Sequence, residues 1–203
     1  TARLAAVSDT ARLDAEVLMA HALGVERGAL LLDPDRFVVP AAFAALVERR
    51  AAREPVAYIG GARDFWTIRL MVGPGVLIPR GDSETLIEAA LVAKPARLAP
   101  LRLLDLGTGP GTLLLALLSE YPGAHGLGLD RSAVALNYAR RNAAALRLDE
   151  RAQFREGGWD DGDWTKGIGG TFDIILCNPP YIEADAALMG DVADFEPPEA
   201  LFA

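Results

Sequence analysis

Hydrophobic residues recur at helical spacing in the first part of the chain. The apolar positions of the first predicted helix fall at i, i+4 and i+7, at Leu13, Val17 and Ala20. A second helix is predicted after Pro40, and it must end before Pro55 because the residue preceding a proline disfavours the helical conformation. We expect these helices to form a small N-terminal helical domain over residues 1–55.

The pattern changes to that of an extended chain over residues 62–72. Its strand-forming side chains are Phe65, Trp66, Ile68 and Leu70. The glycine-proline-glycine sequence at 73–75 follows as a turn, so we expect a β-hairpin here, within a linker of residues 56–82.

Apolar strands and helical segments alternate from residue 101 onward. Strands are predicted at residues 101–106, 125–129, 153–155 and 172–177. Helices are predicted at residues 112–120 and 132–146. This alternation indicates an α/β fold with a parallel, doubly wound sheet. We place this domain at residues 83–203, beginning with a helix near Ser83.

The composition is that of a globular protein. Of the 203 residues, 51% are hydrophobic, and no uninterrupted apolar run approaches the roughly 20 residues needed to span a bilayer. The chain does not open with a basic region followed by a cleavage site, so we expect no signal peptide and no membrane partner. The single cysteine, Cys177, excludes an internal disulfide, favours a cytoplasmic location and is expected in the core of a strand.

The net charge and the few possible metal ligands argue against two classes of function. A formal net charge of -8 argues against broad binding to a phosphate backbone. Arg49, Arg50 and Arg53 are accordingly expected to form a solvated helix face. The two histidines, His21 and His125, cannot supply a typical zinc site with one cysteine. We therefore expect no bound metal and no direct nucleic-acid partner.

A glycine-rich turn separates the strand at 101–106 from the helix after it. Its residues are Gly107, Thr108, Gly109, Pro110 and Gly111. Such a turn lets a ligand approach the backbone closely, beside the electropositive start of a helix. The G-x-G-x-G spacing differs from the dinucleotide pattern, and Pro110 removes an amide that could bind a pyrophosphate. The turn therefore favours a nucleoside-type cofactor, and an ordinary tight turn is the alternative.

Asp130 ends the next predicted strand, about 20 residues beyond the glycine-rich turn. An acid at this distance can accept hydrogen bonds from both ribose hydroxyls of a cofactor. Beside Ser132 it could instead belong to the start of a helix, and for Asp130 alone the two interpretations are close. The glycine-rich turn before it favours the ribose role.

The sequence Asn178, Pro179, Pro180, Tyr181 follows the last predicted strand, at the edge where open parallel sheets bind ligands. The two prolines remove two backbone donors and leave carbonyl acceptors, to which Asn178 adds a side-chain carbonyl. These acceptors suit a planar amide or amino group whose nitrogen must face an electrophile. A rigid turn at the end of a strand is the alternative, but it explains only the prolines.

The combination of these segments resembles the HemK/PrmC family, the release factor glutamine methyltransferases, over nearly the whole chain. The segments that carry the resemblance are residues 12–21, 54–60, 65–66, 77–80, 107–111, 130–132, 159 and 178–181. Asn-Pro-Pro-Tyr alone is shared with DNA adenine methyltransferases, so the N-terminal segments and Ile78-Pro79-Arg80 narrow the match. The chain has Gly81 where the family usually has a proline.

The resemblance implies a Rossmann-like class I methyltransferase sheet that binds S-adenosylmethionine and releases S-adenosylhomocysteine. In the family pattern, the turn from Gly107 to Gly111 holds the methionine part of the cofactor. Asp130 binds the ribose hydroxyls, and Trp159 lies against the adenine. Because the chain stops at Ala203, we expect the last strands of the sheet to be missing.

The resemblance also implies that the substrate is the side-chain amide of a glutamine. Asn178 would touch both the cofactor region and this amide, and Pro179 would lend its backbone carbonyl to the amide. Tyr181 would pack on the amide plane, and Pro180 completes the substrate site. Asn178, Pro179 and Tyr181 are thus the expected catalytic residues.

The partner implied by the resemblance is a peptide-chain release factor, methylated on the glutamine of its Gly-Gly-Gln loop. The N-terminal helical domain would recognise it, and we expect the enzyme to be a monomer. Three alternatives stay open: a glutamine methyltransferase of ribosomal proteins, an adenine-N6 methyltransferase of nucleic acid, and a non-catalytic fragment that binds the cofactor. The net charge disfavours the second of these.

Overall fold

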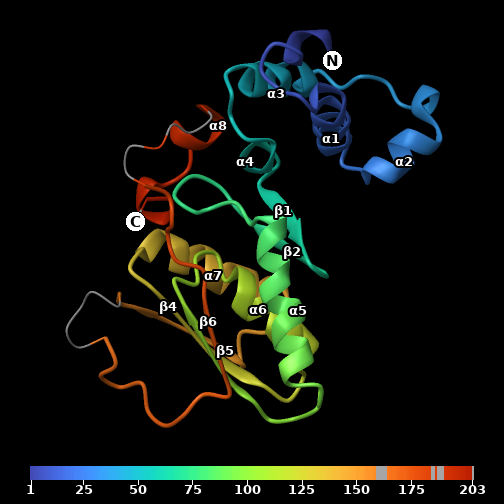
Figure 1. The fold of residues 1–203 in the computed structure, drawn as a ribbon. Coiled ribbons are helices and arrows are strands. Elements are labelled where there is room, and N and C mark those ends of the chain that lie inside the picture. The colour runs from blue at the N-terminus through green and yellow to red at the C-terminus, as the bar shows by residue number, and fades with distance from the viewer. Residues whose placement is uncertain (159–163, 184–185, 187–189, 203) are drawn as a thin grey trace. The chain divides into compact units, whose positions relative to one another are not determined.

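The computed structural model describes residues 1–158, 164–183, 186 and 190–202. The chain divides into two compact units, shown in Figure 1. The helical unit comprises Thr1–Gly61 and Ala187–Phe195, and the sheet unit comprises Ala62–Ala186 and Glu196–Ala203. Among the described residues, none of the helices has the length and apolar character needed to cross a membrane.

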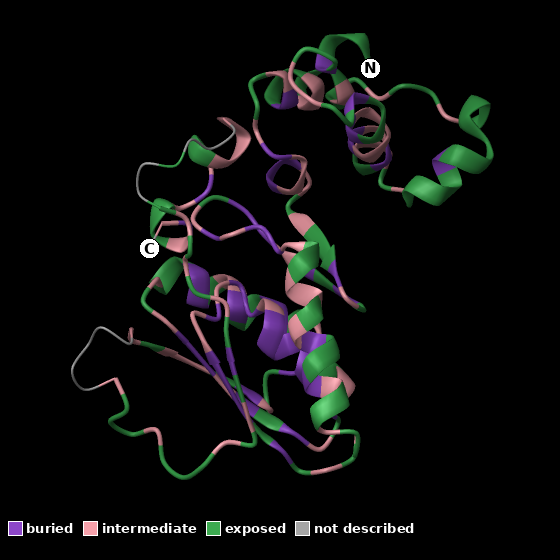
Figure 2. Ribbon diagram, in the orientation of Figure 1, coloured by how far each residue is buried: buried purple, intermediate pink, exposed green. Residues whose placement is uncertain are grey.

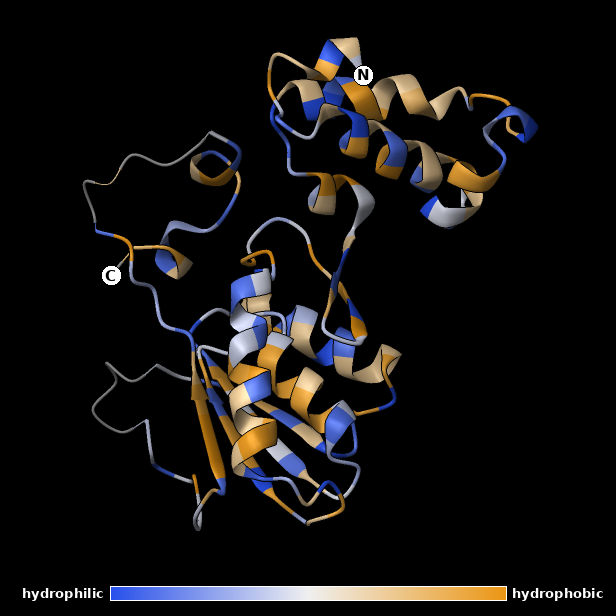
Figure 3. Cartoon of the chain, turned by 45° about the vertical axis from the view of Figure 1, so that its right-hand side comes forward, coloured by the Kyte–Doolittle hydropathy of each residue, from blue (hydrophilic) through white to orange (hydrophobic). Residues whose placement is uncertain are grey.

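The helical unit consists of short helices around a small apolar core. Its α-helices are α1 (Ala11–Leu23), α2 (Arg27–Leu32), α3 (Ala42–Ala51), α4 (Val56–Gly60) and α8 (Gly190–Ala193), and its 3-10 helices are η1 (Ala2–Leu4) and η2 (Pro34–Arg36). The buried core residues are Leu4, Ala11, Leu18 and Ile59. Figure 3 shows hydrophobic and hydrophilic bands along these helices, as expected for helices with one buried face. The predicted N-terminal helical region is confirmed.

A buried arginine contradicts the expectation of a solvated basic face on α3. Arg50 is only 5% exposed, and its Nε donates to Asp14 on α1 at 2.7 Å. Its Nη2 pairs with Asp191 on α8 at 2.8 Å, and Arg53 also pairs with Asp191, at 3.4 Å. A buried guanidinium needs opposite charge around it. Because both acids are distant from Arg50 in sequence, the local pattern around α3 could not reveal this role.

The sheet unit contains an antiparallel hairpin and a four-stranded parallel sheet (Figure 1). Its strands are β1 (Ala62–Phe65), β2 (Ile68–Met71), β3 (Arg102–Leu106), β4 (His125–Asp130), β5 (Ala152–Glu156) and β6 (Ile174–Cys177). Its helices are η3 (Gly81–Ser83), α5 (Glu84–Ala93), α6 (Thr112–Glu120), α7 (Ala133–Ala145) and η4 (Pro198–Ala200). The parallel strands follow the order β5-β4-β3-β6, which confirms the predicted α/β fold with a parallel sheet.

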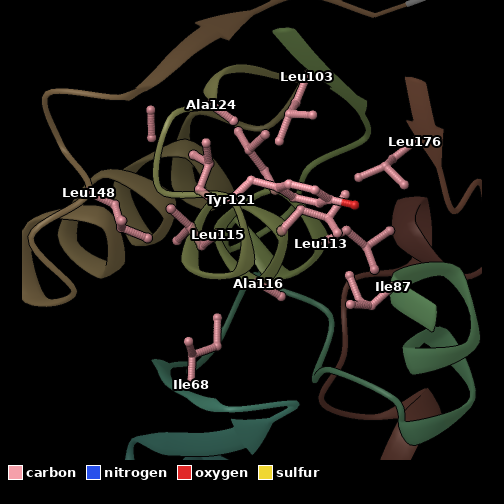
Figure 4. Close-up of a cluster of buried hydrophobic side chains, with 14 of the residues drawn as sticks. Ile68, Ile87, Leu103, Leu113, Leu115, Ala116, Tyr121, Ala124, Leu148 and Leu176 are labelled. Atoms are coloured by element: carbon pink, nitrogen blue, oxygen red, sulfur yellow. The ribbon is translucent and has the colours of Figure 1, made fainter. Parts of the chain in front are cut away.

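The core of the sheet unit forms around α6, which is buried along most of its length (Figure 2). The six residues from Leu113 to Leu118 are all buried, because α6 contacts β3, β4, α5 and α7. Figure 4 shows the ring of Tyr121, directly after α6, among the aliphatic side chains of this cluster. The Tyr121 hydroxyl donates to the carbonyl of Lys94 at 2.7 Å, so the one polar atom of this side chain is satisfied.

The β1–β2 hairpin lies within residues 56–82, as expected, but it closes at Trp66 and Thr67 and not at the turn of residues 73–75. Trp66 has a φ of 54°, a conformation that a bulky residue rarely adopts. Two acids hold it there: its backbone N donates to Glu84 at 2.9 Å, and its Nε1 donates to Glu120 at 2.7 Å. Both acids lie far along the chain, in α5 and α6, so the local sequence could not show where the hairpin closes.

The outer face of β6 is exposed. Ile175 is 61% exposed and Cys177 is exposed as well, whereas Leu176 between them is buried. The expectation that Cys177 lies in the core is therefore wrong. Alternate residues of a strand face opposite sides of a sheet, and an apolar run does not tell whether both sides are covered.

Asn142 on α7 joins the hairpin to the glycine-rich turn. Its buried side chain accepts from the backbone N of Met71 at 2.7 Å and donates to the carbonyl of Met71 at 3.1 Å. It also donates to the carbonyl of Pro110 at 2.9 Å. One amide therefore satisfies backbone groups from two segments that are far apart in sequence.

We expect Asn142→Ala to lower the free energy of unfolding by about 3 kcal/mol, because one buried and two partly buried backbone groups lose their partner. Urea denaturation measures this change. Asn137→Ala, at an exposed position of the same helix, is the matched control and should not lower the stability, because alanine favours helix. Equal effects of the two substitutions would show that Asn142 does not join these segments.

Candidate active site

The register of the parallel sheet brings three sequence motifs to one edge. Leu106, the last residue of β3, pairs with the residue before Asp130 on β4 and with the residue before Asn178 on β6. Gly107, Asp130 and Asn178 therefore emerge side by side at the carboxyl edge. The sheet continues from β3 to β4 on one side and to β6 on the other, and open parallel sheets bind ligands at such a point.

A pocket opens at this edge, within the sheet unit. It contains about 1070 Å³ of space, a volume that includes its open mouth. Its lining comes from residues between 75 and 83, the glycine-rich turn with the start of α6, the ends of β4, β5 and β6, and residues between 197 and 200. Of the predicted turn, every residue except Gly111 lines the pocket.

The glycine-rich turn needs its glycines for steric reasons. Gly111 has a φ of 87°, and a Cβ atom there would lie 2.7 Å from Cδ1 of Leu115. Gly109 has a φ of 57°, again in the left-handed region. Any other residue at these positions would strain the turn that forms one wall of the pocket.

Asp130 holds the turn and also faces the pocket. Its Oδ2 accepts from the backbone N of Gly109 at 2.8 Å, and its Oδ1 accepts from the backbone N of Ser132 at 2.9 Å. Asp130 lines the pocket, as its predicted role requires. A carboxylate offers about four acceptor sites, so these two bonds leave capacity for the hydroxyls of a ligand.

Asp105 on β3 is a site residue to which the sequence motifs assign no role. It lines the pocket and is 1% exposed, and its Oδ2 accepts from the hydroxyl of Thr108 at 2.7 Å. Its Oδ1 is buried without a hydrogen-bond partner among the described residues. Burial raises the pKa of this carboxyl to about 6, although the bond from Thr108 opposes the rise. The signal in the sequence was an acid two residues before the first glycine.

The residues of the Asn-Pro-Pro-Tyr sequence divide between the pocket and the surface. Asn178 and Pro180 line the pocket, whereas Pro179 and Tyr181 do not. The Nδ2 of Asn178 donates to the hydroxyl of Ser83 at 3.3 Å, so its carbonyl oxygen is the acceptor that this side chain offers. Tyr181 is 75% exposed and presents its ring to solvent.

The chain reaches the pocket again after β5. Gly157 and Gly158 line it. Trp159, expected beside the adenine, follows immediately but lies outside the described residues. Among the residues that are described, no group of three or more His, Cys, Asp or Glu side chains is placed to hold a metal ion.

The raised pKa of Asp105 predicts a pH-dependent stability. The carboxyl loses its proton near pH 6 in the folded protein but near its ordinary 3.8 in the unfolded chain. Between these values the folded state binds more protons, so the free energy of unfolding falls as the pH rises, by on the order of 3 kcal/mol in total. Asp105→Asn should abolish this decline and stabilise the ligand-free protein at neutral pH.

Urea unfolding at pH 4.5 and 7.5 measures the effect. The stability difference between Asp105→Asn and the parent protein should grow with pH. Asp149→Asn makes the same change at an exposed position and should show no such growth. A difference for Asp105→Asn that stays constant with pH would be incompatible with a carboxyl that titrates near 6.

Two family models match the chain. Residues 1–61 match the PrmC N-terminal domain, and residues 99–201 match a methyltransferase domain. The parallel sheet, the glycine-rich turn and the acid at the end of β4 thus belong to a methyltransferase domain of the class that depends on S-adenosylmethionine.

Relatives of known name identify the family of the chain. The chain is 48% identical over 195 residues to the release factor glutamine methyltransferase of Rhodospirillum rubrum. The matched region covers 94% of this chain and 58% of that protein. It is 43% identical over 199 residues to the protein of the same name from Caulobacter vibrioides, over 95% of this chain and 67% of that protein. The chain belongs to the release factor glutamine methyltransferase family, as the resemblance predicted.

The chain spans less than two thirds of the length of the Rhodospirillum rubrum relative. Among solved structures, it is similar to the SAM-dependent methyltransferase from Agrobacterium tumefaciens. The similarity has a TM-score of 0.43 and 23% identity, over 50% of this chain and 33% of that chain.

Proposed function

We propose that the protein transfers a methyl group from S-adenosylmethionine to the side-chain amide nitrogen of a glutamine in a peptide-chain release factor. The observation that carries the proposal is the position of Asn178 beside the glycine-rich turn, in one pocket, in a chain of this family. The names of the relatives support the release factor as substrate. We place the reaction in the cytoplasm and assign it to a monomer that needs no nucleic acid or membrane.

The residues of the pocket fit S-adenosylmethionine. This cofactor supplies a methyl group on a positively charged sulfur, which makes the methyl carbon electrophilic. Asp130 would accept from the ribose hydroxyls, and the glycine-rich turn would take the methionine part. The unpartnered Oδ1 of Asp105 calls for a donor or a cation in the pocket, and the cofactor carries both an ammonium group and the sulfonium. We assign the adenine contact to Trp159.

The substrate amide requires orientation more than activation. An amide nitrogen is a weak nucleophile because its lone pair is delocalised into the carbonyl. The side-chain carbonyl of Asn178 and the backbone carbonyl of Pro179 would accept its two N–H groups, turn the lone pair toward the methyl carbon and stabilise the positive charge that grows on nitrogen. Orientation of this kind supplies up to about 7 to 11 kcal/mol. Pro180 and the exposed ring of Tyr181 complete the amide site.

The amide proton leaves after methyl transfer, so the reaction needs no strong base on the protein. Asp173, just before β6, serves the fold, because it accepts from the backbone N of Arg102 at 2.9 Å. Cys177 does not serve as a nucleophile. Partial desolvation of its sulfur, together with the nearby Asp105, raises the pKa of the Cys177 thiol and keeps it protonated at neutral pH.

The proposal is tested by incubating the protein with S-adenosylmethionine and a release factor. Mass spectrometry should then find the mass of one added methyl group on the glutamine of the Gly-Gly-Gln loop, because this amide is the proposed acceptor. A release factor with asparagine at that position is the control and should gain nothing. Parallel incubations contain ribosomal proteins or adenine-containing nucleic acid, and methylation of only one of these would contradict the release factor as substrate. Binding of the cofactor without any transfer would identify a non-catalytic binder.

Asn178→Ala should lower kcat at least about 100-fold, because the nitrogen loses one of the acceptors that orient it. Calorimetry should show that the affinity for S-adenosylmethionine changes little. Asn137→Ala removes an exposed asparagine of α7 and serves as the matched control, with unchanged kcat. If Asn178→Ala keeps full turnover, the role assigned to Asn178 is wrong.

A further inference from the structure

We infer that Glu196 is a positioning residue of the cofactor pocket, which joins two separate segments of the pocket wall. It comes after the Asn-Pro-Pro-Tyr sequence in the chain, and the sequence motifs assign it no role. The inference deepens the proposed function and rests on it for the identity of the cofactor. All the contacts that support the inference lie within the sheet unit.

Glu196 is a buried carboxylate with both oxygens engaged. It is 3% exposed. Its Oε2 accepts from the backbone N of Ile78 at 2.9 Å, and its Oε1 accepts from Nη2 of Arg80 at 2.5 Å. A buried carboxylate is tolerated when an opposite charge and hydrogen-bond donors surround it, and both are present here. Glu196 is thus held in one place by two bonds to a single short segment.

That segment forms one side of the pocket. Leu77, Pro79 and Arg80 line the pocket, and Ile78 between them is buried. Pro79 has no N–H, and the N–H of Ile78 before it is a backbone donor that anchors this stretch. Glu196 supplies the acceptor. Removing that acceptor would free the backbone that carries three pocket residues.

The residues directly after Glu196 form another part of the same wall. Pro197, Glu199 and Ala200 line the pocket, whereas Glu196 itself does not. Its side chain therefore acts behind the wall and ties the segment 77–80 to the segment 197–200. The distance between the two segments, and with it the width of the pocket, depends on this side chain.

Both tied segments also reach the proposed substrate site. Ser83, three residues after Arg80, accepts from Asn178 at 3.3 Å. The carbonyl of Leu201 accepts from the backbone N of Ile182 at 3.1 Å, next to Tyr181. Glu196 thus supports the wall of the cofactor pocket close to the proposed amide site. Its loss should therefore weaken cofactor binding and also reduce turnover.

Two substitutions separate the bonds of Glu196. Glu196→Gln keeps an acceptor for Ile78 but loses the ion pair with Arg80, whereas Glu196→Ala loses both. Calorimetry with S-adenosylhomocysteine, which binds without turnover, should find affinity reduced about 10-fold for Glu196→Gln and about 100-fold for Glu196→Ala. Glu150→Gln makes the same change at an exposed position and should leave the affinity unchanged.

Hydrogen exchange at the amide of Ile78, compared with exchange at the amides of α6, separates the local loss of this bond from a general loss of stability. Without ligand, this amide should be protected in the parent protein and in Glu196→Gln, and it should exchange faster in Glu196→Ala while the amides of α6 stay protected. If Glu196→Ala does not fold, Glu196→Gln decides through its affinity and through its KM for S-adenosylmethionine, which should rise.

The inference is overturned if both variants bind S-adenosylhomocysteine as tightly as the parent protein and only their melting temperature is lower. Glu196 would then only stabilise the fold through its ion pair with Arg80. If the parent protein does not bind S-adenosylhomocysteine, the proposed cofactor is wrong. The inference about Glu196 is then judged by exchange at Ile78, and unchanged exchange in Glu196→Ala would refute it.

Discussion

The parallel register across β3 is the constraint on which the site depends. Leu106 is aligned with the last apolar residues of β4 and β6, so the glycine-rich turn, Asp130 and Asn178 leave the sheet side by side. A slip of one residue would turn every side chain of a strand to the opposite face. The apolar cluster around α6 resists such a slip, because Leu103 on β3 and Leu176 on β6 are buried against it (Figure 4).

Polar side chains from distant segments then shape the pocket that this register creates. Apolar burial is non-directional and holds elements together without specifying their exact spacing. Asn142 ties the hairpin to the glycine-rich turn, and Glu196 ties two wall segments, each through hydrogen bonds of defined length and direction. Asp105 differs from both, because it lines the pocket and one of its buried oxygens has no hydrogen-bond partner among the described residues.

The residues that follow the Asn-Pro-Pro-Tyr sequence belong to both units of the chain. Asp191 on α8 pairs with Arg50 and Arg53 within the helical unit. Glu196, five residues later, is bound within the sheet unit. Ion pairs therefore anchor the stretch that follows Asn178 in each unit separately. Glu196 is buried, whereas Asp191 is partly exposed.

The sequence by itself determined the alternation of strands and helices, the glycine-rich turn, the acid at the end of β4, the Asn-Pro-Pro-Tyr sequence after β6 and the family. These features are local: proline and glycine restrict the backbone where they stand, and hydrophobic spacing reports the period of the element. Only the tertiary structure decided that Trp66 closes the hairpin, that Cys177 is exposed and that Arg50 is buried. It likewise decided the roles of Asp105 and Glu196, because burial and ion pairing depend on partners that folding brings from distant parts of the chain.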